Sequence, residues 1–140
     1  MVLAIALSLQ FNFKAFFGWS PEFVMAVLVA MVFYLDVLEI AILAALSVLI
    51  MNWKPFPELE IAVFFIIPFL AMLGRKISPW NGGVNNIFGI ILSVILFYSV
   101  SSLPVVLDNA YFLALVAGAT AFFGAVIFHA FGYFYKISSV

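Results

Sequence analysis

Long runs of apolar residues, separated by short polar clusters, dominate the pattern along this chain. The runs are continuous, as in residues 61–73 and 87–100, and they do not alternate between apolar and polar positions. Only helices and closed barrels satisfy their backbone polar groups inside a bilayer, and a barrel strand shows alternation over ~10 residues. Continuous runs therefore predict an all-α protein whose helices are embedded in lipid.

Polar clusters rich in proline or glycine divide the chain into segments. The first apolar run covers residues 2–17, and Gly18-Trp19-Ser20-Pro21-Glu22 follows it. This cluster is typical of a helix start: Ser20 can cap, Pro21 suits the first helical position, and Glu22 suits the positive end of the helix dipole. Further loops are predicted at residues 52–58, 75–83 and 99–108, with helices over residues 58–73, 85–100 and 109–135.

Residues 21–51 decide the number of helices. These 31 residues contain no glycine and no proline after Pro21. One helix of that length would measure ~46 Å, against a hydrocarbon core of ~30 Å. Asp36 and Glu39 lie near the middle, where a charge costs at least ~2.5 kcal/mol. We therefore expect two helices that meet near residues 35–39, giving a polytopic bundle of six transmembrane helices in a single domain over residues 1–140. One continuous helix would reduce the number to five.

The composition agrees with a lipid environment. Hydrophobic residues make up 69% of the 140 residues and charged residues 8%, whereas an average soluble domain is about 25% charged. A net charge of −1 gives no reason to expect a nucleic-acid partner. The chain contains no cysteine, which excludes disulfides and thiolate metal sites. The first residues lack the basic region of a signal peptide, so we expect them to form the first membrane helix.

The basic residues suggest an orientation. With six helices, Arg75, Lys76 and Lys136 lie on the same side as both termini, and Lys14 and Lys54 lie on the other side with most of the acids. Because basic loops favour the cytoplasm, we expect cytoplasmic termini in a multi-pass protein of the inner (plasma) membrane.

Three residues are candidates for a polar or ion site. His129 is the only histidine, so haem ligation by two histidines is excluded. It could act as a proton relay if an acid lay beside it, or simply form a hydrogen bond within the bundle. Asp36 and Glu39 are spaced to share one helix face, where they could bind an ion or a proton, or they could belong to a polar turn. No phosphate-binding, metal-binding or catalytic motif is found, so we expect neither an enzyme nor a cofactor.

The last predicted helix carries small residues at four-residue steps. Such residues let two helices approach closely in lipid, where packing drives association. This surface could serve the internal bundle or a partner subunit. The candidate interface residues are Ala110, Ala114, Gly118, Ala117, Ala121 and Ala125.

In the order of its segments the chain resembles the MreD family of rod-shape-determining membrane proteins. The matching features are a short first helix, the Ser20-Pro21-Glu22-Phe23 opening of the second, two short apolar helices in succession, the polar loop at residues 52–57, and Leu73-Gly74-Arg75-Lys76 at the end of the fourth helix. The turn at residues 35–39 lacks the glycines usual in that family, and the third helix ends in Met51-Asn52-Trp53 where an aspartate is usual.

The resemblance implies a six-helix fold similar to the substrate-binding subunits of energy-coupling-factor transporters. It also implies a non-enzymatic scaffold of the bacterial cell-elongation machinery, in contact with an MreC-type protein or a peptidoglycan synthase. Two other functions fit the same pattern. The chain could be the substrate-binding subunit of a small-molecule transporter, with a pocket near Lys54 and residues 55–57. It could also be an accessory subunit of a respiratory or photosynthetic complex.

Overall fold

The computed structural model describes residues 1–51, 59–78, 81–101 and 103–138, and every regular element within them is a helix. The prediction of an all-α fold is confirmed. The described elements are α1 (Val2–Phe17), α2 (Phe23–Met31), α3 (Val37–Met51), α4 (Leu59–Ile77), α5 (Gly82–Ser101), α6 (Leu103–Asp108) and α7 (Ala110–Ser138).

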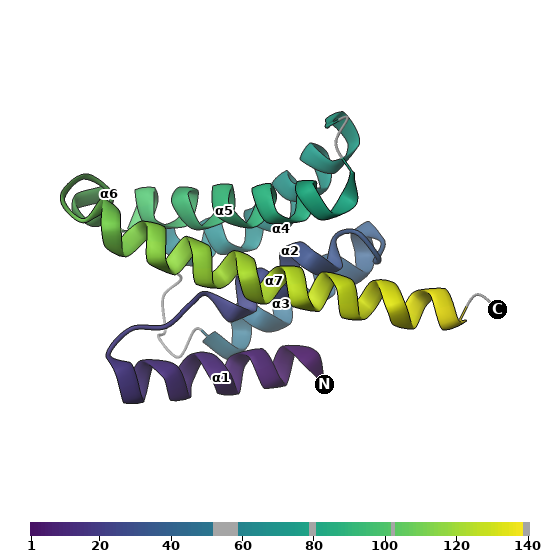
Figure 1. Cartoon of the computed structure of the whole chain (residues 1–140), viewed down its shortest axis with the longest axis horizontal. Helices are drawn as coiled ribbons and strands as arrows, with labels where there is room; N and C mark the ends of the chain where they lie inside the picture. The colour runs from purple at the N-terminus through teal and green to yellow at the C-terminus, as the bar shows by residue number, and fades with distance from the viewer. Residues whose placement is uncertain (52–58, 79–80, 102, 139–140) are drawn as a thin grey trace.

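The core of the bundle is formed around α2. All eight residues of α2 from Phe23 to Ala30 are buried, because α1, α4, α5 and α7 pack against this helix. A helix that is apolar on every side is stable only when it is enclosed in this way. Figure 1 shows α1, α5 and α7 running along the long axis of the molecule, with both termini towards the same end. The longest helix, α7, packs against both α2 and α5.

The prediction of two helices within residues 21–51 is confirmed. The helix α2 ends at Met31 and α3 begins at Val37. Between them the N–H groups of Tyr34 and Leu35 both donate to the carbonyl oxygen of Met31, at 2.9 and 3.0 Å. The turn needs no glycine or proline because contacts from other helices hold it. Among these, the Tyr34 hydroxyl donates to the carbonyl oxygen of Phe128 on α7 at 2.6 Å.

Two predicted loops differ in the structure, because helices extend into them or replace them. The helix α4 continues to Ile77 and α5 already begins at Gly82, so the loop predicted over residues 75–83 is mostly helical. The loop predicted over residues 99–108 is wrong: α5 extends to Ser101 and α6 follows from Leu103. Pro104 does not prevent this short helix, because a proline in the first turn replaces an N–H that has no helical partner. The loop predicted over residues 52–58 lies outside the described residues.

Two helices of the described part of the chain are long and apolar enough to cross a membrane, Gly82–Ser101 and Ala110–Phe134. This indicates membrane association. Two further apolar helices, Val2–Phe17 and Val37–Ile50, are shorter than these. Large apolar side chains also lie on the outside of the bundle, such as Phe122, which is 74% exposed, and Leu107, which is 72% exposed. An outer surface of this kind suits lipid better than water.

Candidate functional site

A carboxyl group is buried in the middle of the bundle. Glu22 is only 7% exposed. Its Oε2 atom accepts a hydrogen bond from Nε2 of Gln10 on α1 at 2.9 Å. Its Oε1 atom accepts one from the hydroxyl of Tyr98 on α5 at 3.3 Å. Each carboxyl oxygen thus has a donor from a different helix, which offsets much of the cost of burying the group.

The backbone beside Glu22 joins the same network. The N–H of Glu22 donates to Oγ1 of Thr120 on α7 at 3.0 Å, and the N–H of Val24 donates to Oε1 of Gln10 at 3.2 Å. We call Gln10, Glu22, Tyr98 and Thr120 the polar cluster. It connects α1, the start of α2, α5 and α7. Thr120 lies ten residues after the start of α7, or ~15 Å along that helix, so the cluster lies well inside the bundle.

Local structure brings Glu22 to this depth. Gly18 ends α1 in the left-handed conformation, with φ of 74°, and its N–H donates to the carbonyl oxygen of Lys14 at 3.1 Å. Glycine adopts this conformation without steric cost, and it commonly reverses the chain after a helix. The next residues are not helical and lead back towards the core before α2 begins at Phe23.

This arrangement corrects the predicted helix start. Glu22 occupies the N-cap position of α2, and its side chain forms no cap of its own. Pro21 precedes the helix, and Ser20 lies further out. The side chain that serves the new helix comes from α1, because Gln10 accepts from the N–H of Val24. Glu22 therefore does not lie at an exposed helix end, where its carboxylate would face solvent.

The polar cluster has a structural role, because its hydrogen bonds connect helices. An acid inside a membrane bundle is expensive and often marks an ion or proton pathway. Here both carboxyl oxygens are already held by amide and hydroxyl donors. Within the described residues no group of three or more metal-ligating side chains is found. The cluster therefore fixes four helices relative to one another.

The structure separates the three residues predicted as a polar or ion site. Asp36 and Glu39 are exposed at the start of α3, and the N–H of Asp36 donates to Oε2 of Glu39 at 3.0 Å. That hydrogen bond is half of a capping box. His129 lies on α7, where its Nδ1 is 2.8 Å from the carbonyl oxygen of Ala125. The two acids belong together in one turn, and the histidine belongs to another helix.

The small residues of α7 form two faces. Ala117 and Ala121 are each only 6% exposed and belong to the core. Gly124 lies on the same inner side, and a Cβ atom added there would lie 2.1 Å from Cδ1 of Ile90 on α5. Ala125 is half-buried. This inner face lets α5 and α7 pack at very short distance.

Ala110, Ala114 and Gly118 are exposed. They lie along a shallow groove of about 370 Å³ whose other wall includes Ile91 and Ile95 of α5. A Cβ atom added to Gly118 would meet no other atom within 4 Å. We call this surface the α5–α7 groove. It is apolar, and its floor lies close to the backbone of a helix that is long enough to span a membrane.

The polar cluster was not predicted from the sequence. Gln10 and Glu22 were visible as polar residues beside apolar runs, but their pairing depends on the chain reversal at Gly18. Tyr98 and Thr120 carry no signal in the sequence that distinguishes them from other polar residues in apolar helices. Comparison of the chain with protein-family models, curated proteins and solved structures finds no match.

Proposed function

We propose that this chain is a non-enzymatic membrane scaffold subunit, and that the α5–α7 groove receives a transmembrane helix of a partner protein. The observation that carries the proposal is the exposed row of Ala110, Ala114 and Gly118 along this groove. In lipid, helices associate through close packing, and small residues at four-residue steps allow two backbones to approach. The groove offers this surface on the outside of the bundle.

The rest of the bundle supports a role in packing. The buried polar groups of the polar cluster are used to hold helices together. The inner small-residue face has no space left at Gly124, where Ile90 and Ala26 already pack. The α5–α7 groove is therefore left for a partner helix. The polar cluster holds the helices that form this groove in place.

We propose a bacterial cell-elongation complex as the setting, on the resemblance to the MreD family. The partner would then be an MreC-type protein or a peptidoglycan synthase, and the chain would cross the inner membrane six times with cytoplasmic termini. The position of both termini towards one end of the bundle supports an even number of crossings (Figure 1). Arg75 and Lys76, which favour the cytoplasmic side, lie in the last turn of α4.

The proposal is tested by filling the groove. In Gly118→Leu, the new side chain would occupy the space that the partner helix needs. We expect co-purification with an MreC-type protein or a peptidoglycan synthase from mild detergent to fall by at least tenfold, since ~1.4 kcal/mol corresponds to that factor. The control is Val126→Leu, which changes an exposed residue of the same helix outside the groove.

The identity of the co-purifying chains separates the alternatives. Equal recovery of the partner from both variants would contradict docking in the α5–α7 groove. Recovery of an ATPase module in place of elongation proteins would favour a transporter subunit. Recovery of redox subunits would favour an accessory role in a respiratory or photosynthetic complex.

One observation bears on the transporter alternative. The pocket predicted for it near Lys54 and residues 55–57 lies outside the described residues. A cavity of about 420 Å³ does exist between α2, α4 and α5, but it lies beside Arg75. Its volume falls in the range of small-molecule sites.

A further inference from the structure

The cavity beside Arg75 differs from the α5–α7 groove in shape and chemistry. It lies between α2, α4 and α5 and has a volume of about 420 Å³. Gly74 and Gly89 contribute to its wall and leave it wide. A Cβ atom at Gly74 would meet nothing within 4 Å, and one at Gly89 would meet only Cγ1 of Val29, at 3.5 Å.

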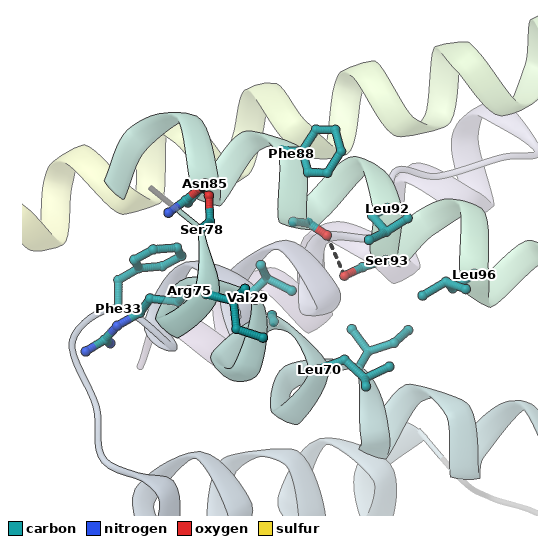
Figure 2. A pocket seen from close by; sticks show the side chains of 15 residues that line it. Val29, Phe33, Leu70, Arg75, Ser78, Asn85, Phe88, Leu92, Ser93 and Leu96 are labelled. Atoms are coloured by element: carbon teal, nitrogen blue, oxygen red, sulfur yellow. Dashed lines mark hydrogen bonds between the residues drawn. The ribbon is translucent and has the colours of Figure 1, made fainter. Parts of the chain in front are cut away.

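Polar and apolar groups are segregated along this cavity. Figure 2 shows Arg75, Ser78 and Asn85 gathered at one end, and Leu70, Leu92 and Leu96 at the other. The Ser78 hydroxyl and Oδ1 of Asn85 are joined by a hydrogen bond of 2.7 Å. The polar groups at this end are therefore ordered. The remainder is hydrocarbon apart from the Ser93 hydroxyl, which donates to the carbonyl oxygen of Gly89 at 2.6 Å (Figure 2). A ligand that fits must itself be apolar along most of its length and polar at one end.

The polar end carries a positive charge. Arg75 is exposed, and its guanidinium lies 5.8 Å from the centroid of the Phe33 ring. Its Nη1 donates to the carbonyl oxygen of Val32, just after α2. In the described part of the chain these contacts are to a ring and a carbonyl rather than to a carboxylate, so the charge is not neutralised by them. A guanidinium has five N–H donors, and its planar geometry suits phosphate.

We propose that this cavity binds one acyl chain of an anionic phospholipid, with the lipid phosphate at Arg75. The acyl chain lies between α4 and α5, against Leu70, Leu92 and Leu96. The phosphate lies at the end of α4, where Arg75 occupies the last turn of the helix. The position suits a headgroup, because a basic residue at the end of a membrane helix lies at the interface.

The chemistry favours a lipid over the other occupants. A partner helix would need a long groove with small residues along it, as α7 provides, whereas this cavity ends at a charged group. A neutral apolar molecule would fill the hydrocarbon part and gain nothing from Arg75. The inference goes beyond the scaffold function, and it involves a surface separate from the α5–α7 groove.

The experiment is native mass spectrometry of the purified full chain in detergent, with dioleoyl phosphatidylglycerol as the probe and dioleoyl phosphatidylcholine as the neutral comparison. We expect the chain to retain phosphatidylglycerol in preference to phosphatidylcholine. Arg75→Gln should weaken phosphatidylglycerol binding by about five- to tenfold, as expected for one charged contact to a lipid. The matched control is Lys76→Gln, which removes the neighbouring charge outside the cavity and should weaken binding less than Arg75→Gln does.

A second pair of variants tests the cavity without touching the charge. Gly74→Leu places a side chain in open space beside the cavity and should displace both lipids, while Gly118→Leu adds the same side chain at an open glycine of α7 and should displace neither. Unchanged lipid binding by Gly74→Leu would overturn the proposal. Equal effects of Arg75→Gln and Lys76→Gln would also overturn it.

Discussion

Nε2 of Gln10 lies 2.9 Å from Oε2 of Glu22, and this hydrogen bond joins the first helix to the start of the second. The same amide accepts a hydrogen bond from the N–H of Val24 through its Oε1 atom. The side chain of Gln10 on α1 therefore caps the N-terminus of α2. Because α2 lies at the centre of the bundle, this one side chain stabilises the element against which α1, α4, α5 and α7 pack.

We expect Gln10→Leu to lower the free energy of unfolding by about 1–3 kcal/mol, since Glu22 and the N–H of Val24 would each lose a buried partner. Reversible unfolding in detergent micelles, followed by circular dichroism, measures this loss. The control is Asn12→Leu on the same helix, which removes an exposed amide whose hydrogen bonds within the described residues are to Ser8 in the preceding turn. Equal losses from the two variants would show that Gln10 has no special role.

Tyr98→Phe removes only the hydroxyl that donates to Oε1 of Glu22. We expect a loss of about 0.5–1.5 kcal/mol, the usual value of one hydrogen bond. Tyr111→Phe removes a hydroxyl from a side chain that is 81% exposed and should change stability by less than about 0.5 kcal/mol. Thermal denaturation of both variants in the same detergent compares them. A larger loss from Tyr111→Phe would contradict the role of Tyr98.

Gly124→Ala should overpack the contact between α5 and α7. The new Cβ atom would lie 2.1 Å from Cδ1 of the fully buried Ile90 and 3.5 Å from Cβ of Ala26. We expect a loss of about 1–3 kcal/mol in the free energy of unfolding. Adding Ile90→Val removes the clashing methyl group and should recover most of this loss, a coupling that a double-mutant cycle measures.

The matched control for this contact is Gly118→Ala on the same helix. A Cβ atom there meets nothing within 4 Å, and alanine is the better helix former. This variant should be as stable as the original chain or more stable by up to about 1 kcal/mol. If both glycine variants lose stability equally, the clash with Ile90 is not the cause.

Asn86 is fully buried on α5, and only one of its two polar side-chain atoms forms a hydrogen bond within the described residues. Nδ2 donates to the carbonyl oxygen of Gly124 at 3.3 Å, while Oδ1 has no hydrogen-bond partner among the described residues. Burying an acceptor in this way is costly. We therefore expect Asn86→Leu to retain the stability of the original chain or to raise it by up to about 1–2 kcal/mol. A loss above about 2 kcal/mol in chemical unfolding would show that Oδ1 is bonded in the working protein.

The hydropathy pattern predicted the helices well where local sequence decides them. The first helix was predicted at its observed bounds. Its end depends on local structure alone, because Gly18 adopts the left-handed conformation there. A break near residues 35–39 was predicted, in part from the cost of placing Asp36 and Glu39 in lipid, and the structure places it slightly earlier, between Met31 and Val37. That argument depends on charge and on the length of the segment against the bilayer, so it needed no glycine or proline in the turn.

Features that depend on contacts distant in sequence were not predicted. Glu22 was interpreted as a helix-start residue, since Ser20 and Pro21 precede it in the usual pattern. Its real partners, Tyr98 and Thr120, lie 76 and 98 residues away. The helix over Leu103–Asp108 was not predicted, because Pro104 was interpreted as a loop residue. The division of the small residues on α7 into two faces likewise depends on where α5 packs.

The chain reversal at Gly18 has a consequence for how the protein is made. The backbone that follows it is not helical, and the N–H of Glu22 finds its acceptor only in Thr120, near the middle of the last helix. During synthesis this partner emerges after all the other helices. The buried N–H of Glu22 therefore lacks this acceptor until α7 has been synthesised. We expect nascent chains that stop before Ala110 to be cleaved rapidly by membrane proteases, and pulse-chase labelling of such truncations measures this.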